Sequence, residues 1–422
     1  MEKLLIINDK LIKDNNIGEN ALLDSKNGKI INKMKIDNYI KDYSKMNNNI
    51  ENFDKTIKVR NSAIDLIRLI GMYGAIMNHI LNYGKGFKKY YKYKKELKFL
   101  QSILFWHNNG FALISGIIGY KTNKYSNLLY LWLYVVFYSV GIHIYFQYFM
   151  RNSIIDISIL FELFPIIFQR YWYFTAYFGM YLFLPVINKG ISILEKNELK
   201  LIVISILGIF VFWRAIQNPK YDVFHLQGGF SILWLLTIYL TGAYIGKYRV
   251  DYTGKKKYIY CFFWLFIFSF STFLFNLSYN NEVSNINGYF KRIFFKLKNR
   301  IINENYDSPI KVMQSISITL FFLQIKFNKY LSKIISFFGQ LSFGIYLIHI
   351  NKLVKLNLLR NIFMNDLNDL NLNSTIIIIL VKDFKIFFIC IFIDYLRYLL
   401  FKIFRIKKIC IALEKIIFKI RS

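Results

Sequence analysis

The sequence predicts an all-α, polytopic membrane protein with about ten transmembrane helices. Its 422 residues are 55% hydrophobic and 19% aromatic, and the mean hydropathy is +0.32. The apolar residues come in blocks of about 20, which is the length that a helix needs to cross the hydrocarbon core of a bilayer. Most charged residues lie between these blocks. This pattern is typical of a multi-pass membrane protein, which we expect in the plasma membrane.

The chain divides into a polar start, a membrane domain and a basic end. Residues 1–60 are rich in Lys, Asn and Asp and lack an apolar core of signal-peptide length, so we expect a disordered cytoplasmic tail. Residues 61–405 form the expected membrane domain, and residues 406–422 a basic cytoplasmic tail. The predicted crossings are, in order, 63–83, 99–120, 127–147, 170–188, 199–216, 229–247, 257–277, 309–328, 334–351 and 376–397.

One further apolar block, residues 153–169, carries Asp156 and Glu162. Carboxylates are costly in hydrocarbon, so we expect an interfacial or re-entrant segment there.

The basic residues predict the orientation. An even number of crossings places both termini on one side, and the basic run after Arg397 indicates the cytoplasm. The lysines of loop 247–257 agree with this orientation, whereas the seven lysines of loop 84–98 oppose it. We therefore expect Arg68 in the cytoplasmic third of the first helix and His79 near its outer end.

The formal net charge of +31 arises from 56 Lys and Arg against 25 Asp and Glu. Because these bases flank apolar blocks, membrane lipid headgroups explain them better than nucleic acid does. The three cysteines form no CxxC pair, and the five histidines form neither HExxH nor an i,i+4 pair. We predict no metal site.

Arg68 and His79 are the main functional candidates, because both lie inside the first apolar block. Eleven residues are about three helical turns, so the two side chains share one face about 16 Å apart along the axis. Asp65 precedes Arg68 by three residues and is placed to neutralise it. Ionisable groups in such a helix usually mark a polar pathway or a site. Snorkelling of Asp65 and Arg68, and an interfacial position for His79, remain alternatives.

A second polar cluster occupies the next crossing, where His107, Asn108, Asn109 and Ser115 interrupt an apolar sequence. Such groups must bond other helices or line a wet cavity. Gly116 permits close helix packing. Two lysines follow, Lys121 and Lys124. They could bind a phosphate-bearing ligand, or they could be topology determinants at the cytoplasmic end of the helix.

Together these motifs resemble the acyltransferase-3 family of integral membrane O-acyltransferases. The likeness begins with Arg68 and His79 and continues through Asn-Gly-Phe-Ala-Leu-Ile-Ser-Gly at 109–116 and the aromatic segment 171–188. Shorter likenesses follow at 228–247, 306–309, 343–349 and 394–397.

The resemblance implies a ten-helix domain that transfers an acyl group, typically acetyl from acetyl-CoA, to a hydroxyl of a surface polysaccharide, glycolipid or lipid-linked sugar. No cofactor is expected to stay bound, and acyl-CoA is the donor substrate. The resemblance makes His79 and Arg68 catalytic candidates. Lys121 and Lys124 replace the family's usual arginine pair, which keeps the charge and loses bidentate geometry.

The remaining candidates have supporting roles. Ser115 joins the two lysines in the expected acyl-CoA site. Asp65, Gly116 and His349 are expected to support the structure, with an interfacial position as the favoured reading of His349. The expected acceptor-binding residues are Asn109, Trp172, Tyr173, Tyr177 and Trp234, although aromatic girdles at membrane interfaces offer another explanation for the rings.

Two other classes of function remain open. Buried charges in a ten-helix protein also suit a transporter or flippase of a sugar or lipid-linked intermediate. A structural membrane protein would use the same polar residues only to join helices.

Overall fold

The computed structural model describes residues 21–23, 30–32, 60–122, 124–150, 158–217, 222–280, 304–367 and 370–419. The chain forms two compact units, Met1–Arg60 and Asn61–Ser422. In the first unit, strand β1 (Ala21–Leu23) pairs antiparallel with β2 (Ile30–Asn32). The rest of the predicted N-terminal tail lies almost entirely outside the described residues.

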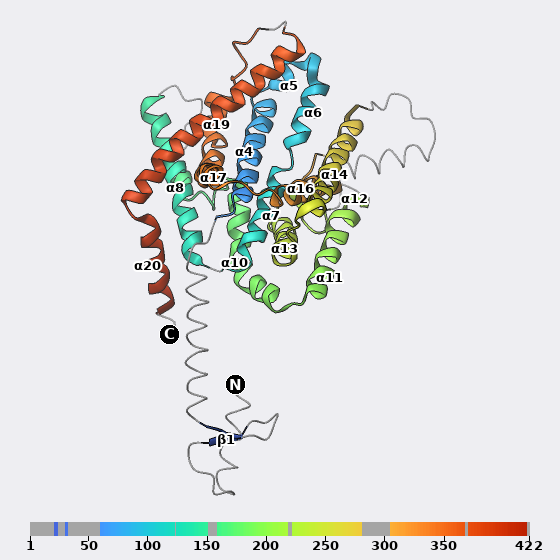
Figure 1. The fold of residues 1–422 in the computed structure, drawn as a ribbon. Helices are drawn as coiled ribbons and strands as arrows, with labels where there is room; N and C mark the ends of the chain where they lie inside the picture. The colour runs from blue at the N-terminus through green and yellow to red at the C-terminus, as the bar shows by residue number, and fades with distance from the viewer. Residues whose placement is uncertain are drawn as a thin grey trace. The chain divides into compact units, whose positions relative to one another are not determined.

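In the described residues of the second unit, every regular element is a helix (Figure 1). Five of its helices are long and apolar enough to cross a membrane, which confirms a helical membrane protein, while ten crossings stay a prediction. These candidate spans are α4 (Ser62–Asn82), α8 (Tyr125–Phe149), the continuous segment Lys196–Ile216, most of α14 (Gly254–Asn280) and α17 (Lys329–His349).

The other helices are shorter, less apolar or interrupted by charges. The segment Lys196–Ile216 consists of α11 (Lys196–Leu207), the π-helix η2 (Gly208–Trp213) and α12 (Arg214–Ile216). The remaining elements are α5 (Gly86–Lys89), η1 (Tyr91–Tyr93), α6 (Lys94–Leu104), α7 (His107–Gly119), α9 (Ile159–Leu163), α10 (Trp172–Ile193), η3 (Gln227–Gly229), α13 (Ile232–Tyr248), α16 (Pro309–Leu323), α18 (Lys352–Val354), η4 (Lys355–Leu359), α19 (Leu372–Ile403) and α20 (Ile406–Lys419).

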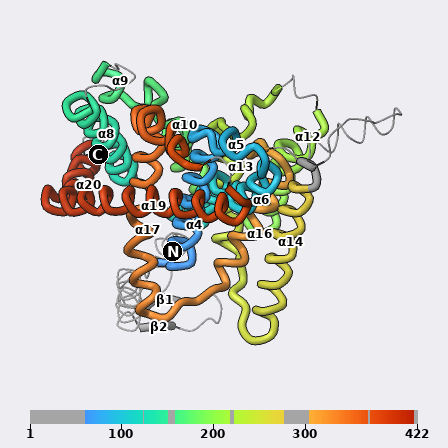
Figure 2. The backbone as a smooth tube through the Cα atoms, turned by 90° about the horizontal axis from the view of Figure 1, so that it is seen from above, coloured from blue at the N-terminus to red at the C-terminus, as the bar shows by residue number. Residues whose placement is uncertain are grey.

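Helix α4 lies at the centre of this unit. It packs against α6, α7, α16, α17 and α19. The view from above shows α4 among α6, α16, α17 and α19 (Figure 2). Helices α4 and α17 run in the same direction. Ser62 and Ser332 meet near their N-termini, with 3.1 Å between the two hydroxyl oxygens, and His79 and His349 meet near their C-termini. The residue predicted to be the base is therefore held against a second long helix.

One predicted crossing differs from the structure. The single crossing expected at 99–120 is divided into α6 and α7, with Phe105 and Trp106 between them. The Trp106 side chain is buried at this break, where a Cβ on Gly110 would come within 2.7 Å of its ring. Much of the expected C-terminal tail forms helix α20, which packs against α8.

The block at 153–169 contains the five-residue helix α9, while Asp156 lies outside the described residues. Glu162 is fully buried, accepts a hydrogen bond from Ser139 and pairs with Arg170. A carboxylate in an apolar block is thus accommodated by a cation and a hydroxyl.

Glycines bring α7 and α13 into backbone contact. A Cβ at Gly116 would lie 2.0 Å from the Tyr239 carbonyl oxygen, and one at Gly242 would lie 2.2 Å from that of Leu113. Small residues at a membrane helix interface permit such close approach. This contact fixes α7, which carries the second polar cluster, against α13.

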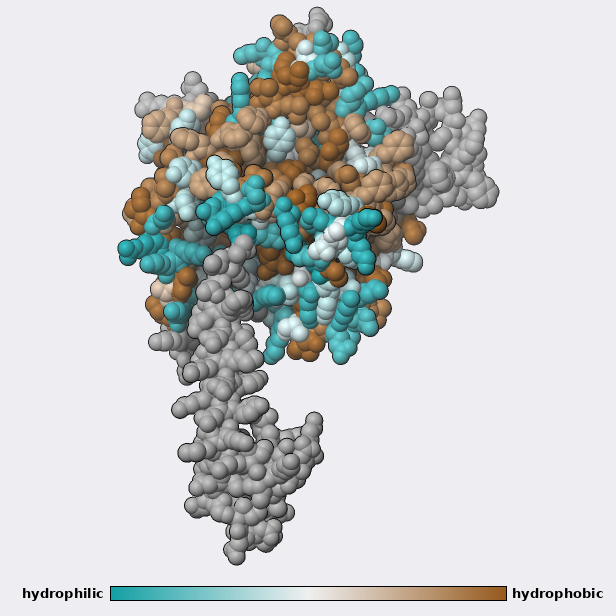
Figure 3. Space-filling view, in the orientation of Figure 1, coloured by the Kyte–Doolittle hydropathy of each residue, from teal (hydrophilic) through white to brown (hydrophobic). Residues whose placement is uncertain are grey.

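The surface agrees with a membrane environment. Large apolar side chains are exposed along α8, α11, α14 and α19. Figure 3 shows a broad hydrophobic zone with hydrophilic side chains gathered above and below it. An apolar surface of this extent is expected to face lipid.

Candidate active site

A pair of histidines forms the centre of the candidate site. His79, on the last turn of α4, is partly exposed, and His349, the last residue of α17, is fully buried. The distance between His79 Nδ1 and His349 Nε2 is 2.9 Å, which is a normal hydrogen-bond length. The sequence favoured an interfacial His349, whereas the structure places it directly against His79.

The surrounding hydrogen bonds assign the tautomers of both rings. His349 Nδ1 lies 2.5 Å from the Ile345 carbonyl oxygen, which only accepts, so this nitrogen carries the hydrogen. In neutral His349 the Nε2 atom is then an acceptor and receives the hydrogen on His79 Nδ1. The Nε2 atom of neutral His79 consequently holds a lone pair, which is the requirement for a general base.

Further basic and aromatic groups surround His79. His107 and Lys355 lie close enough to interact with it electrostatically. The Tyr83 ring is centred 5.4 Å from the His79 ring, and Lys355 Nζ lies 4.1 Å from the centre of the Tyr83 ring. His107 donates from Nδ1 to the Leu104 carbonyl oxygen at 3.2 Å, which leaves its own Nε2 as an acceptor when the ring is neutral.

Arg68 lies three turns below His79 on α4 and pairs with Asp65, with 2.9 Å between Arg68 Nη1 and Asp65 Oδ1. The Asp65 carboxylate is buried against Gly339 of α17, whereas the Arg68 side chain keeps about a quarter of its surface exposed. Tyr177 interacts with the Arg68 charge and with Ser115. The structure therefore brings together three predicted site residues, from α4, α7 and α10.

Lys121 and Lys124 are exposed just after α7 and just before α8. Lys121 Nζ lies 5.6 Å from the centre of the Tyr120 ring. Both lysines follow Ser115 by fewer than ten residues, so they lie toward the Arg68 end of α4 and away from the two histidines.

Asn109 and Trp234 join three parts of the chain. The Trp234 indole N–H donates to Asn109 Oδ1 at 2.9 Å, and Asn109 Nδ2 donates to the Tyr306 carbonyl oxygen at 2.8 Å. Both side chains are almost completely buried. These bonds fix α7 to α13 and to the loop before α16. Because the polar atoms of both side chains already have partners within the protein, acceptor binding by Asn109 or Trp234 stays a prediction.

Trp172 and Tyr173 begin α10 and are half-buried. The Trp172 ring is centred 4.4 Å from that of Phe230. The Tyr173 ring lies edge-on to Phe111 at 6.3 Å, and Phe111 follows His107 by one helical turn. The aromatic start of α10 thus reaches the neighbourhood of the histidines.

Two buried cations were not among the predicted site residues. Arg397 pairs with Asp394 through Nη2 and Oδ2 at 2.9 Å and stacks over Tyr134. Lys311 lies between the rings of Phe105 and Phe275 and interacts electrostatically with His107. The Asp394 and Arg397 pair repeats the i,i+3 spacing of Asp65 and Arg68, a signal that the sequence offered.

Asp307 lies in the loop before α16, next to the Tyr306 carbonyl that binds Asn109. Burial raises the pKa of its carboxyl to about 6, and the Arg214 guanidinium, 4.0 Å away, offsets only part of this rise. Within the described ranges, no cluster of three or more His, Cys, Asp or Glu has a geometry that would hold a metal ion.

Comparison with known proteins gives one match. The family model described as "Acyltransferase domain", of the acyltransferase-3 group, matches residues 61–395, from the start of α4 into α19. This range covers most of the chain and contains every candidate site residue named above except Arg397. No curated protein and no solved structure matches the chain.

Proposed function

The chain belongs to the acyltransferase-3 family, and from this premise we propose that it acylates a hydroxyl of a surface polysaccharide, glycolipid or lipid-linked sugar, using acyl-CoA, with acetyl-CoA as the first donor to test. The observation that carries the proposal is the hydrogen-bond chain from the Ile345 carbonyl through His349 to His79. It orients the His79 ring and directs the basic nitrogen away from His349.

The reaction requires a base because an alcohol is a poor nucleophile at neutral pH. His79 Nε2 takes the hydroxyl proton as the acceptor oxygen attacks the thioester carbonyl. The tetrahedral intermediate then collapses, the carbon–sulfur bond breaks, and the CoA thiolate leaves with the proton returned from His79. His349 acts as a positioning residue, since its Nε2 accepts the hydrogen of His79 Nδ1 throughout.

Arg68 is assigned to the donor. It keeps its charge at any physiological pH, it is partly exposed, and Asp65 holds it in place. Lys121, Lys124 and Ser115 belong to the same end of the site and supply charge and a hydroxyl for the CoA portion. The acyl group must then extend along α4 for about 16 Å to reach His79.

Trp172 and Tyr173 are assigned to the acceptor because aromatic faces suit sugar rings. They begin helix α10, and Tyr173 packs edge-on against Phe111 of α7. Tyr177, which the sequence suggested for the acceptor, interacts with Ser115 and the Arg68 charge and is assigned to the donor end.

A transporter or flippase is the competing function, and it has no reason to recognise the thioester. The test is acetyl transfer from labelled acetyl-CoA to glycan or glycolipid in membranes that contain the protein. We expect transfer with the wild type and loss of at least about a hundredfold with His79→Ala. Absence of both acetyl-CoA binding and transfer in the wild type would favour transport.

A further inference from the structure

A pocket of about 360 Å³ opens at the C-terminal end of α4. Its polar lining consists of Lys85, Lys88, Lys94, Lys98 and Asn82. Asn82 follows His79 by three residues, so the pocket begins within one helical turn, about 4.5 Å, of the proposed base. The pocket therefore lies beside the reacting end of the site.

The charges of this pocket are unbalanced. Lys98 is buried and pairs with Glu304, with 2.6 Å between Nζ and Oε1. Lys85 and Lys88 are exposed and Lys94 is half-exposed, and no acidic side chain lines the pocket in the described part of the chain. Like charges that line one pocket repel one another, and a bound anion relieves this repulsion.

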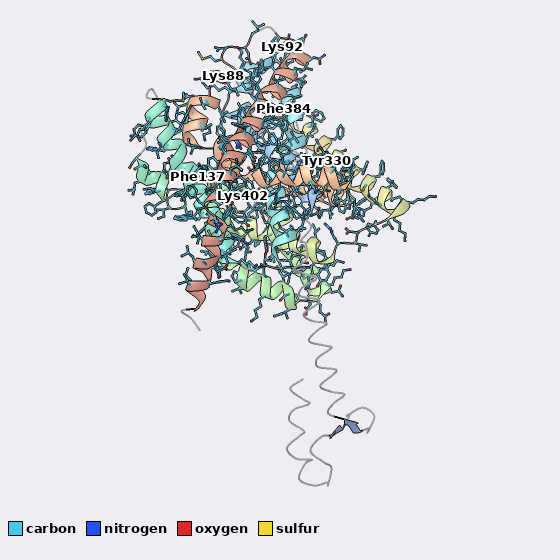
Figure 4. The ribbon with its side chains drawn as sticks, turned by 60° about the vertical axis from the view of Figure 1, so that its left-hand side comes forward. Lys88, Lys92, Phe137, Tyr330, Phe384 and Lys402 are labelled. Carbon is cyan, nitrogen blue, oxygen red and sulfur yellow. The ribbon has the colours of Figure 1, made fainter. Side chains whose placement is uncertain are left out.

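The backbone holds these lysines in place. Lys85 has a φ of 61°, a left-handed conformation that is unfavourable for a side chain with a Cβ, and its carbonyl oxygen accepts bonds from the Lys88 and Lys89 amides. Helix α5 starts at this turn and directs Lys88 outward at the top of the molecule, near Lys92 (Figure 4). Hydrophilic side chains gather over the same end in Figure 3.

These lysines also contradict the expected orientation. In the predicted orientation, loop 84–98 with its seven lysines would lie on the side that the positive-inside rule keeps poor in them. A ligand offers a reason for their presence that membrane insertion does not.

We propose that the pocket binds a phosphate or diphosphate group of the acceptor. This inference rests on the proposed function and defines its substrate class as a phosphate-bearing glycan or glycolipid. Four lysines line the pocket, and lysine ammonium groups suit a multiply charged tetrahedral anion, whereas a planar carboxylate is better matched by arginine. Anchoring the phosphate here brings a nearby hydroxyl to His79, which lies at the opposite end of α4 from the assigned donor site.

Two double variants test the proposal with equal loss of charge. The variant Lys88→Gln/Lys94→Gln removes two lysines that line the pocket. The control Lys92→Gln/Lys95→Gln removes two exposed lysines of the same loop that do not line the pocket. Each full-length protein, in phosphatidylcholine nanodiscs, is titrated with inorganic pyrophosphate by calorimetry. We expect the pocket variant to bind at least about tenfold more weakly than the wild type and the control variant to bind like the wild type.

Kinetics then identify the source of the phosphate. A prenyl-diphosphate-linked sugar is compared with the matching uncharged alkyl glycoside as acceptor, with acetyl-CoA as donor. We expect the pocket variant to raise the KM of the charged acceptor at least about tenfold and to leave the KM of the neutral acceptor and of acetyl-CoA unchanged.

Three results would overturn the proposal. Equal weakening by both double variants would indicate a diffuse basic surface. A raised KM for acetyl-CoA in the pocket variant would assign the pocket to the CoA phosphates. Loss of pyrophosphate binding when phosphatidylglycerol is added, with no preference for the charged acceptor, would assign it to bilayer headgroups. If the wild type acylates neither acceptor, the proposed function fails, and pyrophosphate titration still decides whether the pocket binds phosphate.

Discussion

His79 Nδ1 lies 2.9 Å from His349 Nε2 although 270 residues separate the two histidines in the chain. His349 in turn donates to the Ile345 carbonyl oxygen of its own helix. These two contacts engage three of the four ring nitrogens. The fourth, His79 Nε2, is left to accept a proton from the substrate. The parallel packing of α4 against α17 therefore fixes the orientation and the tautomer of the proposed base.

Replacing His349 should slow the chemical step and leave substrate binding nearly unchanged. His349→Ala removes the acceptor of the His79 Nδ1 hydrogen, so the ring loses its fixed tautomer and orientation. We expect kcat to fall about tenfold to a hundredfold, with a smaller fall for His349→Gln, whose side-chain oxygen accepts the same hydrogen.

The matched control is His143→Ala, which removes another buried helical histidine outside the site. Steady-state kinetics of acetyl transfer separate kcat from KM. An effect of His143→Ala as large as that of His349→Ala would mean that only folding is being measured.

Arg68 and Asp65 should behave as a coupled pair. Arg68→Gln leaves the buried Asp65 carboxylate without its Arg68 partner, and breaking a buried pair costs about 3–5 kcal/mol, so we expect little folded protein. The double variant Asp65→Asn/Arg68→Gln should recover folding, measured by thermal unfolding in detergent, while its KM for acetyl-CoA stays raised. A wild-type KM in the folded double variant would remove Arg68 from the donor site.

Gly116 should tolerate no side chain. A Cβ at this position would lie 2.0 Å from the Tyr239 carbonyl oxygen, so Gly116→Ala must separate α7 from α13 at a cost of about 1–3 kcal/mol or more. Gly190→Ala is the control, because nothing lies within 4 Å of a Cβ there and alanine favours a helix. The thermal midpoint should fall only for the first variant, and equal midpoints would contradict the close packing.

Asp307 should make stability depend on pH. Burial raises the pKa of its carboxyl in the folded protein to about 6, above the usual value of 3.8. The folded state therefore holds its proton more tightly, and this contribution to stability is full below pH 3.8 and is lost as the pH rises through 6. Thermal midpoints at pH 4.5 and 7.5 measure the loss. Asp307→Asn should reduce it, and an unchanged pH dependence would exclude the Asp307 carboxyl as its source.

The sequence was sufficient to predict a helical membrane protein and to identify Arg68 and His79 of α4 as candidates. Arg68 and His79 stood out because charge in an apolar helix is costly, and periodicity placed them on one face. The partner of His79 depends on how α17 packs, and no local pattern encodes a contact over 270 residues. His349 therefore looked interfacial although it is fully buried.

The break between α6 and α7 was missed for a similar reason. Phe105 and Trp106 are apolar, so the hydropathy of 99–120 is continuous and gives no sign of the break, at which the Trp106 side chain is buried. The lysines of loop 84–98 were visible in the sequence, but their convergence on one pocket beside His79 required the turn at Lys85.

The most direct test of the account is single-turnover acetyl transfer by His79→Gln, with acetyl-CoA binding measured on the same preparation. Glutamine keeps a polar side chain near His349 and cannot act as the base. We predict that acetyl-CoA binding stays within about twofold of the wild type while the transfer rate falls by at least about a hundredfold. A transfer rate equal to that of the wild type would contradict the assignment of His79 as the general base.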